Sequence, residues 1–170
     1  MTTAGPVLAT DIVGLLQARE LTLATAESIT AGLVAATIAD VPGCSSVLRG
    51  GVVAYATDTK ASVLGVDPAL LEHVVSQEVA VQLARAAARL LHADIGVGTT
   101  GVAGPDELDG QSPGTVWIAV HDAGRDRTTS RLLELSGDRR SVRQATVDAV
   151  FELVREVVEA RPRALGGGQE

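Results

Sequence analysis

Short apolar runs rich in Val, Ile, Ala and Gly alternate along the chain with segments whose apolar side chains recur every three or four residues. This alternation constrains the fold most, because it is typical of strands that are covered by helices on both faces of a sheet. The last two predicted strands flank a short turn and are expected to pair as an antiparallel hairpin. The predicted fold class is α/β, a three-layer α/β/α sandwich with a mixed, roughly five-stranded sheet. The pattern predicts helices over 7–20, 30–39, 58–64, 76–92 and 138–160, and strands over 21–26, 46–56, 93–100, 115–122 and 128–136.

The length fits a single domain, which we expect to span residues 1–161. A chain of 170 residues lies within the usual size range of one domain. The tail over 162–170 has nothing to bury and is expected to be disordered. Trp117, Tyr55 and Phe151 are the only aromatic residues, so the core must be built from aliphatic side chains.

The charge balance argues against a nucleic-acid-binding protein. Fourteen Lys and Arg residues against 21 Asp and Glu residues give a net charge of −7, which disfavours binding a polyanion but allows a small anionic ligand. Cys44 is the only cysteine, so no disulfide or Cys-based metal cluster is expected, as in a reducing cytoplasm. No apolar run approaches the roughly 18 residues of a membrane span, so we expect a cytoplasmic protein without a membrane partner.

Glu27 and Ser28 stand at a corner between a predicted strand and a predicted helix. A serine at this place is often the N-cap of the helix. It can also point into the crevice at the carboxyl end of a strand, where open α/β sheets bind their ligands. In that second interpretation the backbone N–H groups near Ile29 and Thr30 serve as oxyanion donors. The sequence leaves open whether Glu27 accepts hydrogen bonds from backbone amides or from an incoming carboxamide.

A serine nucleophile needs a base, and Lys60 is the candidate. It lies five residues after Tyr55, just past a strand that looks buried, where desolvation can lower the pKa of its ammonium group. The alternative is an ordinary solvated lysine on a short helix. The three histidines are each expected at the surface: His73, His92 and His121.

Three arginines occur at the start of the last predicted helix, in the sequence GDRRSVR. Cations in the first turn oppose the helix dipole unless an anion lies nearby. Arg139 and Arg143 are four residues apart and share one helix face, as a phosphate clamp requires. Pairing with Asp138 or another surface acid is the alternative. The acidic run from Asp106 to Asp109 lacks the alternation of a calcium-binding loop. We therefore expect no metal site.

The stretch GVGTTG over 96–101 formally satisfies a dinucleotide-binding pattern. That pattern requires a helix after the third glycine, whereas residues 102–106 continue into a Gly- and Pro-rich loop. A dinucleotide-binding oxidoreductase is therefore a weak alternative. We expect a glycine-lined strand end where the backbone approaches a ligand.

Three segments together resemble the CinA C-terminal domain family, named for competence-damage-inducible proteins. They lie in the family's order and span residues 23 to 147 approximately. Typical members read A-E-S-C-T-G-G, then G-G-x-V-x-Y-S-N-x-x-K, then T/S-G-I-A-G-P, then G-D-R-x-x-[IV]-R. The segments are TAESITAGLVAATIADVPGCSSVLRGGVVAYATDTKASVLGV, TTGVAGPDELDGQSPGTVWIAV and SGDRRSVRQAT.

The resemblance implies an amidohydrolase that converts nicotinamide mononucleotide and water to nicotinate mononucleotide and ammonia, without a cofactor. It implies that Ser28 is the nucleophile, that Lys60 takes the serine proton, and that Tyr55 orients the lysine or relays the proton. The expected substrate-binding residues are Glu27 and Thr30, from the corner described above, together with Thr100, Gly101, Arg139 and Arg143, which the resemblance implies. Of these, Thr100 and Gly101 line the pocket, and Arg139 with Arg143 holds the phosphate. The resemblance also implies that the protein forms a homodimer.

Four positions depart from the family pattern. Ile29 and Ala31 replace the usual Cys and the first of two glycines, and Ala56 with Thr57 replaces Ser-Asn after the tyrosine. A non-catalytic nucleotide-binding module of the same fold is therefore the main alternative. Larger relatives carry this module behind a domain that resembles molybdopterin-binding proteins, and we expect the stand-alone form here.

Overall fold

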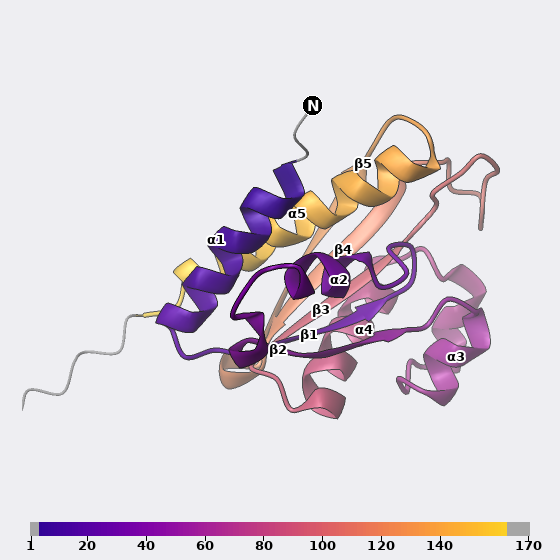
Figure 1. The fold of residues 1–170 in the computed structure, drawn as a ribbon. Coiled ribbons are helices and arrows are strands. Elements are labelled where there is room, and N and C mark those ends of the chain that lie inside the picture. Colours follow the sequence, from indigo (N-terminus) through magenta and orange to yellow (C-terminus); the bar gives the residue numbers. More distant parts are fainter. Residues whose placement is uncertain (1–3, 163–170) are drawn as a thin grey trace, which may run out of the picture.

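The computed structural model describes residues 4–162, which form one five-stranded sheet with the strand order β2-β1-β3-β4-β5. β1 pairs in parallel with β2 and with β3, while β3–β4 and β4–β5 are antiparallel. The sheet is therefore mixed, as predicted, and the expected hairpin is confirmed (Figure 1). The strands are β1 Leu23–Glu27, β2 Leu48–Val53, β3 Ile95–Gly101, β4 Thr115–Asp122 and β5 Arg127–Glu134.

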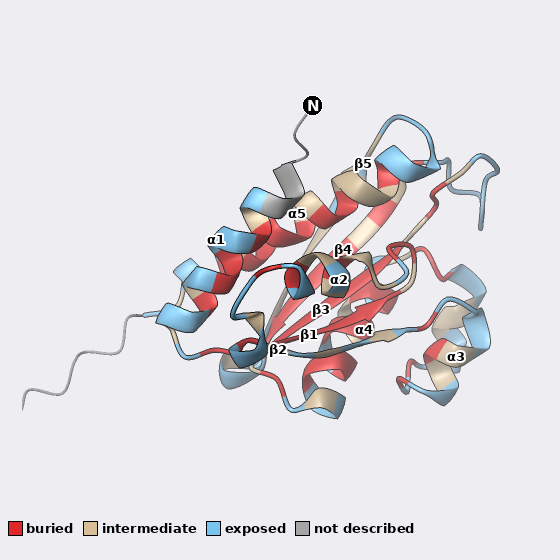
Figure 2. Ribbon diagram, viewed as in Figure 1, coloured by how far each residue is buried: buried red, intermediate tan, exposed pale blue. Residues whose placement is uncertain are grey.

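Helices cover both faces of this sheet and complete the predicted three layers. α1, α2 and α5 share one core with the sheet, and α1 runs beside α5 (Figure 1). α4 packs on the opposite face of the sheet, and α3 contacts the 3₁₀ turn that precedes α4. The central strands are buried, whereas the edge strands β2 and β5 are partly exposed (Figure 2). The helices are α1 Ala4–Ala18, α2 Leu33–Ala39, α3 Thr57–Ser62, α4 Gln77–Leu91 and α5 Arg139–Glu159, with short 3₁₀ turns at Cys44–Ser46, Pro68–His73 and Ala123–Arg125.

Capping residues fix the starts of the two long helices that flank the sheet. The Ser76 hydroxyl accepts from the amide of Val79 at 3.3 Å and caps the start of α4. The Asp138 carboxylate accepts from the amide of Ser141 at 2.8 Å at the start of α5. This hydrogen bond is the main reason that the pKa of the Asp138 carboxyl lies below its usual value.

The glycines of β3 serve helix packing. A Cβ at Gly96 or Gly98 would collide with the α4 carbonyls of Ala84 or Ala80, so α4 lies directly on the strand. The prediction that these glycines let backbone approach a ligand is therefore wrong for Gly96 and Gly98. The polypeptide after β3 forms a loop and not a helix, which removes the basis of the dinucleotide-binding alternative.

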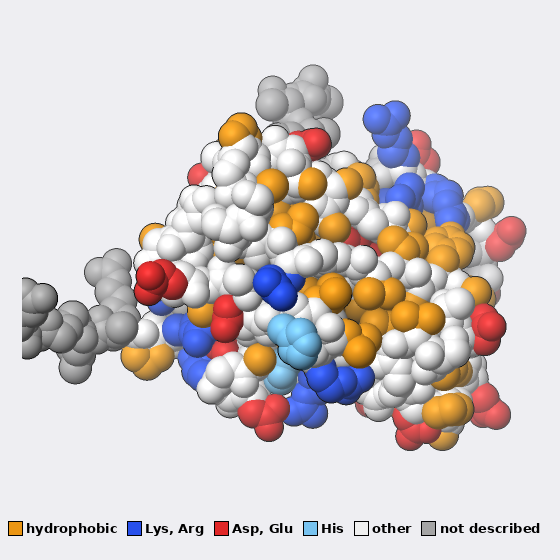
Figure 3. Space-filling view, turned by 60° about the horizontal axis from the view of Figure 1, so that its bottom comes forward, with side chains coloured by type: hydrophobic (Ala, Val, Ile, Leu, Met, Phe, Trp, Pro, Cys, Tyr) orange, Lys and Arg blue, Asp and Glu red, His pale blue; other side chains and the backbone are white. Residues whose placement is uncertain are grey.

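The predicted disordered tail lies outside the described residues beyond Pro162. None of the described helices is long and apolar enough to cross a membrane. On the face shown in Figure 3, Lys and Arg side chains form separate small groups among acidic and apolar side chains. That face offers no continuous basic track for a polyanion.

Candidate active site

A cavity of about 420 Å³ lies beyond the carboxyl ends of β1 and β3. Its wall also includes α3, the loop after β3 and the first residue of α5. Open α/β sheets bind ligands at this edge, where parallel strands diverge. Most of the predicted site residues line the cavity: Ser28, Tyr55, Lys60, Thr100, Gly101 and Arg139. Glu27, Thr30 and Arg143 do not.

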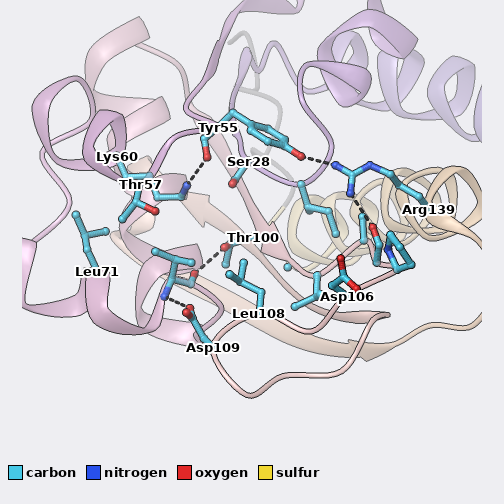
Figure 4. A pocket seen from close by; sticks show the side chains of 17 residues that line it. Ser28, Tyr55, Thr57, Lys60, Leu71, Thr100, Asp106, Leu108, Asp109 and Arg139 are labelled. Atoms are coloured by element: carbon cyan, nitrogen blue, oxygen red, sulfur yellow. Dashed lines mark hydrogen bonds between the residues drawn. The ribbon is translucent and has the colours of Figure 1, made fainter.

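Ser28 follows β1 and begins a tight turn. Its amide donates to the carbonyl of Thr99 at 3.0 Å, and its carbonyl accepts from the amide of Ala31 at 3.1 Å. The hydroxyl points into the cavity (Figure 4). α2 begins only at Leu33, with Gly32 at the N-cap, so both the predicted helix start at residue 30 and the interpretation of Ser28 as a cap are wrong.

Lys60 is buried beneath the same cavity, with 1% of its surface exposed. Its ammonium donates to the carbonyls of Ala54 at 3.0 Å and Tyr55 at 3.3 Å. Within residues 4–162, no carboxylate forms a salt bridge with it. Burial lowers the pKa of this ammonium, because desolvation disfavours its charged form. The alternative of a solvated lysine is wrong.

The Ser28 hydroxyl and the Lys60 amine are directed into one cavity (Figure 4). In the described part of the chain, the Lys60 amine donates to main-chain carbonyls and no direct hydrogen bond joins it to the Ser28 hydroxyl. Catalytic contacts often tighten only when substrate binds. A neutral amine beside a hydroxyl is chemically able to take the hydroxyl proton. Lys60 is also the only lysine in the whole sequence.

Tyr55 and Arg139 form the rim of the cavity. The Arg139 guanidinium donates to the phenol oxygen of Tyr55 and to the carbonyl of Gly104 at 2.9 Å. The Tyr55 side chain is 55% exposed and does not reach Lys60. Tyr55 therefore contacts the lysine through its main chain alone. Arg139 brings a positive charge to the mouth of the cavity.

Thr100 and Gly101 form the floor where β3 ends. The Thr100 hydroxyl donates to the carbonyl of Val74 at 2.7 Å, and Asp109 accepts from the amide of Val74 at 2.9 Å. These two contacts attach the segment around Val74 to the cavity wall. Neither contact was predicted from the sequence, where Val74 lies in no motif and Asp109 was only a rejected metal-ligand candidate. Among the described residues, no three His, Cys, Asp or Glu side chains are grouped so that they could hold a metal ion.

Glu27 lies behind the turn that carries Ser28 and is completely buried. Its carboxylate accepts from the amides of Val34 at 3.0 Å and Ala35 at 2.9 Å, and from the hydroxyl of Thr25 at 2.9 Å. It thus satisfies amides of the first turn of α2 that a helix otherwise leaves unpaired. Of the two roles that the sequence left open, the structure shows the contact with backbone amides.

Thr30 and Arg143 also lie behind the turn. The Thr30 hydroxyl is buried against the hydroxyl of Thr99 at 2.8 Å. The Arg143 guanidinium donates to the carbonyls of Ile29 at 3.1 Å and Thr30 at 2.9 Å. Both residues support the nucleophile turn in this structure, and neither reaches the cavity that Ser28 faces.

The sequence that forms this site matches a known protein family. Residues 6–158 match the CinA C-terminal domain. The chain belongs to the CinA C-terminal domain family. Among solved structures, a CinA superfamily protein from Klebsiella pneumoniae superposes with a TM-score of 0.88 at 28% identity, covering 92% of this chain and 99% of that one. A competence/damage inducible protein from Agrobacterium tumefaciens gives 0.85 at 30% identity, covering 90% and 94%.

Longer relatives contain the same domain. A CinA-like protein of Frankia casuarinae is 44% identical over 155 residues, which are 90% of this chain and 35% of that protein. A competence-damage inducible protein of Listeria innocua is 39% identical over 150 residues, which are 87% of this chain and 36% of that protein. The chain therefore spans about a third of the length of these curated relatives.

Proposed function

We propose that this CinA-family domain hydrolyses the carboxamide of nicotinamide mononucleotide to give nicotinate mononucleotide and ammonia. The observation that carries the proposal is a buried lysine that has no carboxylate partner among residues 4–162 and is directed into the same cavity as a serine hydroxyl. This pair suits a Ser-Lys version of nucleophilic catalysis. The family resemblance supplies the substrate, and the cationic rim at Arg139 suits its phosphate.

The proposed reaction has two stages. Neutral Lys60 takes the proton of Ser28 while the serine oxygen attacks the carboxamide carbon. The C–N bond then breaks, and the leaving nitrogen takes the proton from Lys60 to depart as ammonia. A water molecule gives its proton to Lys60 and attacks the resulting ester, and Ser28 recovers a proton as nicotinate mononucleotide leaves. Lys60 ends the cycle neutral, so no external acid or base is consumed.

The remaining residues have supporting roles in this proposal. Tyr55 orients Lys60 through its carbonyl and holds Arg139 through its phenol. Thr100 and Gly101 line the side of the cavity next to Ser28. The homodimer that the resemblance implies remains a prediction, which light scattering on the purified protein checks.

Ammonia release from nicotinamide mononucleotide tests the proposal. We expect release by the unmutated protein, and losses of at least about 10³-fold in Ser28→Ala and Lys60→Met. Ser45→Ala, at an exposed serine outside the cavity, is the matched control and should keep full activity. If the unmutated protein binds the nucleotide but releases no ammonia, the domain is a binding module, which is the second candidate.

A further inference from the structure

The loop between β3 and β4 contains a small hairpin beside the cavity. The amide of Leu108 donates to the carbonyl of Gln111 at 3.2 Å, and the amide of Gln111 donates back to the carbonyl of Leu108 at 2.8 Å. Asp109 and Gly110, which lie between them, have left-handed backbones with φ of 54° and 70°. This geometry matches a type I′ turn, for which Asp-Gly is a preferred pair. The hairpin therefore has a defined shape.

This hairpin presents one apolar side chain to the cavity. Leu108 is the only apolar residue from Asp106 to Ser112, and it lines the same cavity as Ser28. It remains 46% exposed and, within residues 4–162, belongs to no cluster of the buried core. Single exposed leucines are common on protein surfaces, so exposure alone indicates nothing. A leucine that is unused by the core and lines a ligand-sized cavity is placed to contact a ligand.

Asp109 attaches the hairpin to the rest of the protein. Its carboxylate accepts from the amide of Val74 at 2.9 Å, and the carbonyl of Val74 accepts from the Thr100 hydroxyl at 2.7 Å. Val74 thus connects the hairpin to the end of β3. Among residues 4–162, no other hydrogen bond joins residues 108–111 to a different part of the chain. The place of Leu108 at the cavity therefore depends on this one contact.

The cavity has an apolar side and a polar side. Three of its lining residues, apart from Leu108, belong to one apolar cluster: Leu71, Val74 and Val102. Figure 4 shows Leu108 and Ser28 in the same cavity, with the serine hydroxyl among polar side chains. A flat ring that carries a carboxamide suits this division, because the ring buries apolar surface while the carboxamide meets the serine.

We propose that the Leu108–Gln111 hairpin is a substrate-binding element, in which Leu108 packs on the pyridine ring of the substrate. Asp109 is the positioning residue that holds the leucine at the cavity. This inference rests on the proposed amidohydrolase function and deepens it, because it makes the ring a determinant of affinity besides the phosphate. A ligand that lacks the ring should therefore be insensitive to the loss of Leu108.

Two ligands test the contact between Leu108 and the ring. Dissociation constants are measured in the Ser28→Ala background, which prevents turnover, for nicotinamide mononucleotide by calorimetry and for ribose 5-phosphate by competition at millimolar concentrations. Leu108→Ala should weaken nucleotide binding about 5- to 20-fold, as expected for losing an apolar contact. Binding of ribose 5-phosphate should stay within about 2-fold.

Leu132→Ala is the matched control, because Leu132 is 45% exposed on β5 and does not line the cavity. It should leave the affinity for both ligands unchanged. The inference is overturned if Leu108→Ala binds the nucleotide as tightly as the background protein. It is also overturned if the variant weakens both ligands equally, since that result indicates a general disturbance of the cavity and not a contact with the ring.

Two variants of Asp109 test the positioning role. Asp109→Gly tolerates the left-handed backbone but lacks the carboxylate, whereas Asp109→Asn keeps an acceptor for the Val74 amide and also tolerates this backbone. Asp109→Gly should weaken nucleotide binding about 3- to 10-fold and speed hydrogen exchange of the Val74 amide. Asp109→Asn should recover most of the affinity and the protection. Unchanged affinity in Asp109→Gly removes the positioning role.

The outcomes separate this inference from the proposed function. If the unmutated protein binds the nucleotide without releasing ammonia, the amidohydrolase function fails, and the comparison of the two ligands still decides the role of Leu108. If ammonia is released and Leu108→Ala binds both ligands as before, the inference fails and the function stands. If the nucleotide binds to neither the unmutated protein nor Ser28→Ala, both are overturned.

Discussion

Lys60 contacts Tyr55 through the main chain and not through the phenol. The ammonium donates to the Tyr55 carbonyl at 3.3 Å, while the phenol oxygen accepts from Arg139. Carbonyl oxygens carry only partial negative charge, so they stabilise an ammonium less than a carboxylate does. The neutral amine that catalysis requires is therefore favoured by the surroundings of Lys60.

The titration of Lys60 is directly observable, because the chain has no other lysine. Protein labelled at lysine should give one side-chain NMR signal, with a midpoint below the ordinary value of 10.5 because the ammonium is desolvated. The rate constant kcat/KM should rise with pH through the same midpoint, since only the neutral amine accepts the serine proton. A midpoint at or above 10.5 would remove Lys60 as the base.

The lowered pKa of Lys60 also predicts how the free energy of unfolding depends on pH. Below the folded-state pKa, the lysine is charged in the folded and in the unfolded protein. Its burial there lowers the free energy of unfolding by a constant amount. Between that pKa and about 10.5, the unfolded chain binds more protons, so stability rises with pH. The free energy of unfolding, relative to that of Lys60→Met, should increase by about 1.4 kcal/mol for each unit of pKa difference. Urea titrations of both proteins from pH 6 to 11 measure this, and a flat or falling difference contradicts it.

Tyr55→Phe should leave the pH profile of kcat/KM unchanged. The variant keeps the carbonyl that binds Lys60 and loses only the contact with Arg139. Arg139 becomes less ordered at the rim, so KM should rise about 3- to 10-fold, as expected for losing one hydrogen bond to a charged group. A shifted pH midpoint, or a kcat loss above about 100-fold, would show that the phenol takes part in proton transfer.

The sequence alone predicts those elements that local periodicity and caps determine. The helices over 76–92 and 138–160 and the β4–β5 hairpin were predicted because their patterns depend on residues close in sequence. The start of α2 was misplaced because its first amides are capped by Glu27, which belongs to the preceding strand. A helix start of this kind has no local signature of the usual capping residues.

The sequence likewise predicts only the part of the site that lies in local motifs. Ser28, Lys60 and Tyr55 occur in short recognisable motifs, so their place at one cavity followed from the sequence. The contacts of Arg143 with Ile29 and Thr30 join distant segments, and periodicity on α5 says only which face the arginine occupies.

Glu27 should contribute strongly to stability. Its buried carboxylate accepts three hydrogen bonds, and Glu27→Ala leaves the amides of Val34 and Ala35 and the hydroxyl of Thr25 unpaired. We expect a loss of about 3–5 kcal/mol in the free energy of unfolding, with a smaller loss for Glu27→Gln, which keeps one oxygen acceptor. Urea denaturation measures both. Glu156→Gln, at an exposed glutamate paired with Arg131, is the control and should change stability by less than about 1 kcal/mol.

Ala31 occupies a left-handed conformation, with φ of 50°, at the position where family members usually have glycine. Because a Cβ is strained there, Ala31→Gly should raise the free energy of unfolding by about 0.5–1 kcal/mol. Ala36→Gly, in the exposed interior of α2, is the matched control and should lower it by about 1 kcal/mol.

Ala31 does not line the cavity, so its methyl group has no direct contact with a bound nucleotide. Ammonia release by Ala31→Gly should therefore stay within about 3-fold of the unmutated rate. A rate increase above about 10-fold at unchanged KM would mean that the alanine displaces the nucleophile turn, because an amide donor moved by a fraction of an ångström affects kcat first. That result would identify the substitution as the reason for a slower enzyme.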